Sequence, residues 1–151
     1  MKGRRRLLVG IALVLAAADG IWWASRQHGE RQDYELGTTP LAVTVADDRV
    51  LPLFDEAGGR WLLAGKPLAS LRGQVRRSGD GKASYVVVRL AADAGQTSFR
   101  HALLALVRDG HCLAGIATGV ANRPDGERVP VHRLVWVRDD AGDARRCSAA
   151  Q

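Results

Sequence analysis

Residues 85–118, with the sequence YVVVRLAADAGQTSFRHALLALVRDGHCLAGIAT, are the stretch that decides the fold. Residues 85–90 form an unbroken β-branched run, which is typical of a strand covered on both faces. Between Phe99 and Val107 apolar residues recur at helical spacing and share one face, which predicts a helix. Residues 112–118 read as a second buried strand. A strand, a helix and a strand in this order predict a βαβ unit whose two strands are parallel.

Helix-terminating residues bound the predicted helix. Thr97 or Ser98 is placed to cap its amino end, and Gly110 is placed to end it. A second helix is predicted over residues 67–77, because Pro67 suits a first helical position and apolar residues follow at helical spacing.

The remaining strands are predicted from short alternating or apolar runs. They cover residues 41–46, 50–54, 60–64 and 131–138. Pro52 places the second of these at a sheet edge, where a partner strand could add. If the last strand lies antiparallel beside residues 112–118, Arg138 comes near Cys112. The predicted fold class is therefore α+β: a small mixed β-sheet domain with two helices and one βαβ unit, preceded by a single transmembrane helix.

Two cysteines, Cys112 and Cys147, lie in the second half of the chain. In an exported protein an even pair is expected to form a disulfide. The antiparallel last strand allows the tail to return Cys147 to Cys112. The loop that such a bridge closes would give about 3–4 kcal/mol of stabilisation from chain entropy. A nucleophilic or metal-binding cysteine is not favoured, because Cys112 opens an apolar strand and no CxxC spacing is present.

The amino-terminal segment combines a basic cluster, an apolar run and two tryptophans. The interface residues predicted here are Arg4, Arg5, Arg6, Trp22 and Trp23. Residues 7–24 are long enough to cross a membrane, with the arginines in the cytoplasm and the tryptophans at the far interface. The same segment fits a signal peptide that is cleaved after Ala18. Both interpretations place the rest of the chain outside the cytoplasm, and the uncleaved anchor is favoured.

One ionisable residue, Asp19, interrupts the apolar run. A charge within a transmembrane helix is a candidate functional group, because desolvating it is costly. The alternative is that Asp19 lies near the interface and reaches water, or follows the cleavage site. The alternative is favoured.

The composition excludes several function classes. The chain has 151 residues and a net charge of +6, but Lys2 and the three arginines of the basic cluster supply four of these charges, which leaves +6 − 4 = +2. The excess of positive charge therefore indicates how the chain is oriented in the membrane and does not indicate nucleic-acid binding. No phosphate-binding glycine loop, GxSxG motif or metal-ligand spacing is present. The four histidines are far apart in sequence. We expect no enzyme activity, no cofactor and no metal.

Several of these segments together resemble the ExbD/TolR family of proton-channel accessory proteins. The residues that carry the resemblance are residues 41–46, 61–68, Leu71, 86–89, 99–107, 109–110 and 115–118. The resemblance implies one transmembrane helix, a linker and a small periplasmic α/β domain. The family's Pro-Leu-x-Asp motif is missing, and Asp19 lies near the opposite end of the apolar run, so the proton-coupling role is not carried onto it.

The expected organisation has four parts. They are an anchor or signal sequence at 1–24, a linker at 25–39, a periplasmic α/β domain at 40–138 and a mobile tail at 139–151. The expected function is that of a single-pass inner-membrane protein with a periplasmic interaction domain, as an accessory subunit of an energy-coupling or transport complex. Its expected partners are a multi-helix inner-membrane channel subunit and a periplasmic protein or a second copy of the chain. The alternative is a cleaved periplasmic binding or structural domain without proton coupling.

Overall fold

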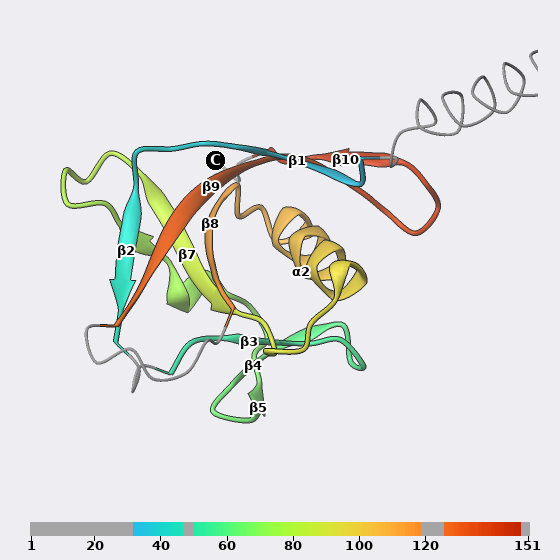
Figure 1. The fold of residues 1–151 in the computed structure, drawn as a ribbon, viewed down its shortest axis with the longest axis horizontal. Helices are drawn as coiled ribbons and strands as arrows, with labels where there is room; N and C mark the ends of the chain where they lie inside the picture. Colours follow the sequence, from blue (N-terminus) through green and yellow to red (C-terminus); the bar gives the residue numbers. More distant parts are fainter. Residues whose placement is uncertain (1–31, 47–49, 119–125, 149–151) are drawn as a thin grey trace, which may run out of the picture. The chain divides into compact units, whose positions relative to one another are not determined.

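The computed structural model describes residues 32–46, 50–118 and 126–148. The chain divides into two compact units, and the second begins at Asp33. In its described part this second unit is mostly β-structure, with ten strands, one α-helix and one short 3-10 helix (Figure 1). The elements are β1 Tyr34–Gly37, β2 Ala42–Val45, β3 Leu53–Asp55, β4 Arg60–Leu63, β5 Lys66–Pro67, η1 Arg72–Gln74, β6 Arg76–Arg77, β7 Ser84–Arg89, α2 Gln96–Arg108, β8 Leu113–Ala117, β9 Glu127–Arg138 and β10 Ala144–Arg146.

The predicted βαβ unit is confirmed. β7 and β8 are parallel neighbours, with Val86 opposite Ala114 and Arg89 opposite Ala117, and α2 connects them. The sheet runs in the order β1-β9-β8-β7-β3-β4-β5. β9 is antiparallel to β8. It is the longest strand, and it also pairs with β1, β2 and β10.

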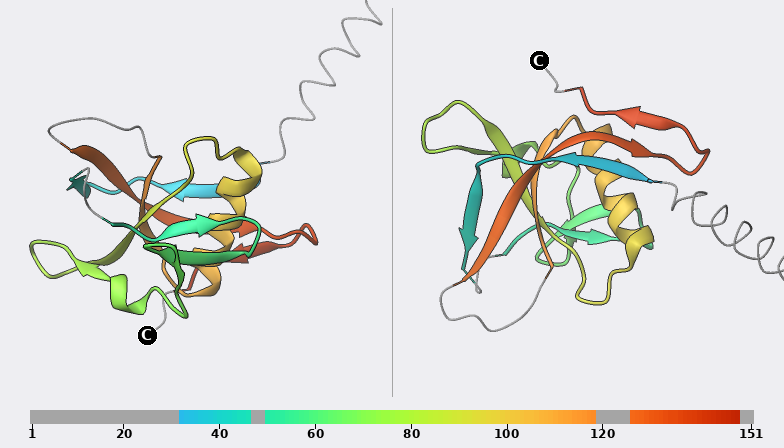
Figure 2. Two further views of the ribbon diagram at one scale, coloured as in Figure 1. Left: turned by 90° about the horizontal axis from the view of Figure 1, so that it is seen from below. Right: turned by 45° about the horizontal axis from the view of Figure 1, so that its top comes forward.

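Alternate side chains of β7 enter two separate hydrophobic clusters, which confirms that the strand is covered on both faces. Val86 and Val88 pack into a cluster with α2, which lies against one face of the sheet (Figure 2). Val87 faces the opposite way, into a cluster with Val45 of β2 and Val129 of β9. Successive side chains of a strand point to opposite faces, so a strand that is buried on both faces needs apolar residues at every position.

The carboxyl end of α2 follows the sequence prediction, and its amino end does not. Gly110 has φ of +78°, and the amides of Gly110 and His111 donate to the carbonyls of Val107 and Leu106. This is a Schellman motif, in which glycine takes the left-handed conformation after the helix. The amino-terminal cap is Gly95, and no side chain caps it. Ser98 lies inside the helix, where its hydroxyl has another partner.

The helix predicted over residues 67–77 is wrong. Pro67 belongs to β5, which folds back on β4 through Ala64 and Gly65, and both of these turn residues have positive φ. The amide of Leu68 donates to the carbonyl of Trp61, so Leu68 continues the hairpin pairing and does not begin a helix. A hairpin turn of this kind matches the twist of the strands it joins. Only the three residues of η1 are helical in this segment.

The fold class predicted from the sequence is therefore corrected. The described part is a mostly β domain with one α-helix, and β2 and β9 supply side chains to the cluster on the sheet face opposite α2. Residues 50–54 are not an edge strand either, since β3 lies between β4 and β7. Strands also occur in the segments expected to be the linker and the tail, as β1 and β10.

Candidate functional site

The residues predicted at the membrane lie outside the described part of the chain. They are Arg4, Arg5, Arg6, Asp19, Trp22 and Trp23. Within residues 32–46, 50–118 and 126–148, no helix has both the length and the apolar character needed to cross a membrane.

The predicted disulfide is present. Cys112 and Cys147 are bonded, with their Cα atoms 5.6 Å apart. Cys112 precedes β8, and Cys147 follows β10, where its amide donates to the carbonyl of Val135 at 3.0 Å. The path of the tail differs from the expected one. β9 extends beyond β8, and β10 folds back along this extension and brings Cys147 to the start of β8.

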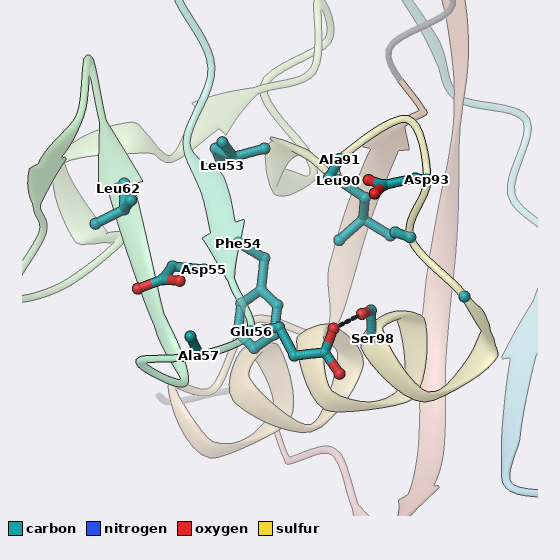
Figure 3. Close-up of a pocket in the computed structure, with 12 residues that line it drawn as sticks. Leu53, Phe54, Asp55, Glu56, Ala57, Leu62, Leu90, Ala91, Asp93 and Ser98 are labelled. Carbon is teal, nitrogen blue, oxygen red and sulfur yellow. Dashed lines mark hydrogen bonds between the residues drawn. The ribbon is translucent and has the colours of Figure 1, made fainter.

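A cavity of about 370 Å³ opens at the carboxyl end of β7, between the β3–β4 hairpin and the amino end of α2 (Figure 3). Ligands bind preferentially outside the carboxyl ends of parallel strands, so this cavity is the candidate functional site. Apolar side chains of Phe54, Leu62 and Leu90 line it, together with Leu53, which is 36% exposed.

Three carboxylates also line the cavity, and each has different surroundings. Asp55 forms an ion pair with Arg60 at 3.6 Å. Glu56 accepts a hydrogen bond from the Ser98 hydroxyl, as Figure 3 shows. Asp93 is exposed and has no hydrogen bond or ion pair with any described residue. The cavity therefore presents apolar surface and negative charge together.

Glu56 also belongs to a polar cluster that joins three parts of the fold. The Oε1 atom of Glu56 lies 3.9 Å from Nδ1 of His101, and Nε2 of His101 lies 3.1 Å from Oδ1 of Asp140. Arg100 donates to Asp140 at 2.6 Å and to the backbone carbonyl of Arg138 at 2.9 Å. The hairpin, the helix and the β9–β10 turn are thus connected through one histidine.

Asp139 and Asp140 of the β9–β10 turn have lowered pKa values for different reasons. The hydrogen bond from Arg100, supported by His101, lowers the pKa of Asp140. The hydrogen bond from Arg145 at 2.7 Å, supported by the backbone amides of Asp143 and Ala141, lowers the pKa of Asp139. Asp139 therefore organises the turn, as expected for an aspartate at such a position, whereas Asp140 joins the turn to α2.

This arrangement is suited to binding. The Ser98 hydroxyl donates to the Glu56 carboxylate, but Ser98 is only 8% exposed, so a substrate has little access to it as a nucleophile. Among the described residues, no group of three His, Cys, Asp or Glu side chains is arranged to hold a metal ion. Carboxylates over an apolar floor suit a long cationic side chain, whose methylene groups can pack while its charged head meets the acid groups.

The sequence did not single out this site. Asp140, His101 and Glu56 belong to no motif in the sequence, and Ser98 is predicted only as one of two possible helix caps. The residues are distant in sequence, and only the fold brings them together. The i, i+3 spacing of Ser98 and His101 on a predicted helix was the one available signal, because it puts both on one helix face.

The fold and the site define a class of protein. It is a disulfide-bonded, mostly β domain with one βαβ unit, and an acidic cavity lies at the carboxyl end of β7. Comparison of the chain with protein-family models, with curated proteins and with solved structures gave no match.

Proposed function

We propose that the protein is an exported interaction domain, held at the periplasmic face of the inner membrane by residues 1–24. The single observation that carries this proposal is the Cys112–Cys147 disulfide. Structural disulfides persist in oxidising compartments and are rare in the cytoplasm. The basic cluster followed by an apolar run supplies an independent argument, because this pattern directs export of the following chain.

The partner we propose is a protein that inserts a lysine or arginine side chain into the acidic cavity. Leu53 and the apolar floor support this, since the methylene groups of such a side chain need apolar surface. Asp93 supports it as well, because its carboxylate has no described partner and would be neutralised in the complex. In this role the protein serves as an accessory subunit of an ExbD/TolR-like energy-coupling or transport complex, beside a multi-helix channel subunit.

The parallel β7–α2–β8 unit supports this assignment to an ExbD/TolR-like complex, and the hairpin in place of the expected first helix speaks against it. The second candidate function is therefore a periplasmic binding domain that is released by cleavage after Ala18. The disulfide favours the two candidates equally, since both place the domain outside the cytoplasm.

Protease treatment of spheroplasts tests the location. We expect external protease to degrade the folded domain in intact spheroplasts while a cytoplasmic marker survives. Complete protection of the domain until the spheroplasts are lysed would refute export. Intact mass of the recovered protein then separates the two candidates, because a chain that begins at Met1 is retained and a chain that begins at Asp19 is cleaved.

Charge reversal tests the cavity as the partner site. Asp93→Lys should abolish co-purification with the channel subunit, because it places a cation where the partner's cation would bind. Asp109→Lys is the matched control, since Asp109 is also exposed and without an ion pair among the described residues but lies outside this cavity. Equal co-purification of both variants would rule out the cavity.

A further inference from the structure

A second cavity, of about 490 Å³, lies at the amino ends of β7 and β8. It is thus at the opposite end of the parallel strands from the acidic cavity. The β6–β7 hairpin, η1 and the turn after α2 form its walls, and Cys112 of the disulfide lines it. Its volume falls within the range of about 300–1,000 Å³ that is usual for small-molecule sites.

Positive charge dominates this second cavity. Arg72, Lys82 and Arg133 line it from three different elements or turns, and all three are exposed. The side chains of these three residues form no ion pair and no hydrogen bond with a described residue. Asp109 is the only acidic side chain among the described lining residues, so their formal charge is +3 − 1 = +2 with a neutral histidine.

His111 is the least satisfied polar group of this cavity. Its backbone amide is fixed by the Schellman motif at the end of α2. Its Nε2 atom is buried and has no hydrogen-bond partner among the described residues. Burial lowers the pKa of His111, Asp109 opposes this effect, and Arg72 adds to it. The imidazole is therefore neutral at pH 7 and would gain a proton more easily beside an anion.

The end of α2 does not cancel this positive field. The carboxyl end of a helix carries partial negative charge, which would disfavour an anion. Here the carbonyls of Leu106 and Val107 already accept hydrogen bonds from the His111 and Gly110 amides. The unpaired side-chain cations therefore determine which ligands the cavity favours.

We propose that this cavity binds a small anion that carries two or more carboxylate or phosphate groups. Guanidinium groups bind both kinds of group through paired hydrogen bonds, and an ammonium group adds a point charge. Two or more anionic groups are needed to engage cations that enter from η1, the β6–β7 hairpin and β9. This site is separate from the acidic cavity, and it does not depend on where the protein resides.

Calorimetric titration of the full-length, oxidised protein with citrate and with pyrophosphate tests the proposal. Citrate supplies carboxylates and pyrophosphate supplies phosphates, so the stronger binder identifies the source of the anionic groups. Acetate, with a single carboxylate, should bind more weakly than either. Binding of all three anions with equal affinity, or of none, would overturn the proposal.

Two variants on one strand supply the matched comparison. Arg133→Gln should weaken binding of the preferred anion about tenfold or more, because it removes a charge-assisted hydrogen bond. Arg128→Gln removes the same charge from an exposed position on β9 outside the cavity and should leave the affinity within about twofold. Equal losses of affinity in both variants would show that the anion is attracted non-specifically, and this result would overturn the proposal.

The His111 ring provides a local readout. In the NMR spectrum, addition of citrate or pyrophosphate should shift the His111 ring resonances and leave those of His132, which does not line the cavity, in place. Movement of both rings to the same extent, or of neither ring, would place the anion elsewhere. Thermal unfolding of each variant without ligand confirms that the fold is intact.

Discussion

Removal of the Cys112–Cys147 disulfide should destabilise the domain strongly. The two cysteines are separated by 35 positions in the sequence. With a loop of this length, the chain-entropy relation gives an entropy loss of about 13 cal/mol/K in the unfolded state, or about 3.8 kcal/mol at 25 °C. Loss of such an amount is a large fraction of the 5–15 kcal/mol that roughly spans the stability of domains.

The assay is thermal and urea-induced unfolding of the wild type and of Cys112→Ala/Cys147→Ala. A domain of about 115 residues has an unfolding entropy of about 0.24 kcal/mol/K, so the loss corresponds to a fall in Tm of about 15 °C. Wild-type protein in reductant should unfold at nearly the same temperature as the variant, which controls for the alanine side chains. The single variants Cys112→Ala and Cys147→Ala each break the same bridge, so neither should lower Tm by more than the double variant does.

The reasoning would be refuted if the double variant lost less than about 1 kcal/mol, because the bridge would then not restrict the unfolded chain as the entropy relation requires. A large loss in the variant with no effect of reductant on the wild type would instead assign the effect to side-chain packing of Cys147, which contacts the α2 cluster.

Three further predictions test packing, backbone geometry and charge. Leu103→Ala, at a fully buried position of α2, should cost about 2–5 kcal/mol in urea unfolding, and a loss below 1 kcal/mol would argue against the described core. Gly126→Ala should cost about 1–3 kcal/mol, because φ is +80° and the new Cβ would lie 2.7 Å from the Val45 carbonyl oxygen. Gly59→Ala, also at positive φ but with open space around it, should cost less in the same assay, and an equal cost would discount the clash. Asp139→Asn should flatten the acid limb of the stability profile: the folded-state pKa of Asp139 is lowered, so its contribution is present above pH of about 4 and is lost as pH falls. An unchanged slope between pH 5 and 2 in acid unfolding followed by circular dichroism would contradict this assignment.

The central βαβ unit could be predicted because its signals are local and agree with one another. The β-branched run of β7, the helical spacing of α2 and Gly110 at the helix end all occur within one short stretch. Two-sided burial of β7 follows directly from its apolar sequence, and the structure places Val87 and Val88 in different clusters. The disulfide could be anticipated as well, because only two cysteines were available to pair.

The segment from β4 to β6 could not be predicted, because its sequence fits two structures. Leu68, Leu71 and Val75 lie at helical spacing, and Pro67 is acceptable both at a helix start and in an edge strand. The Ala64–Gly65 turn decides between them, and Ala64 is an uncommon residue at positive φ. Beyond the hairpin, Leu71 before η1 is fully buried, whereas Val75 after η1 remains 40% exposed, so these two apolar residues do not share one buried face.

β1 and β2 pair with β9 over a long distance in the sequence, whereas β10 pairs with β9 across the short turn between them. Each of these strands is short, and no local pattern specifies its neighbour. For the same reason the acidic cavity was missed, since the hairpin residue Glu56 reaches Ser98 and His101 only after β3 has paired with β7. The small and charged residues of the tail predict no strand, yet Ala144–Arg146 form β10 and bring Cys147 to its partner.

The most direct test of the central claim is the intact mass of the natural protein after rapid trapping of free thiols in living cells. We predict a species in the membrane fraction that begins at Met1, carries no alkylated cysteine and is two hydrogen atoms lighter than the reduced chain. A protein in the cytoplasmic fraction with both Cys112 and Cys147 alkylated would contradict the account.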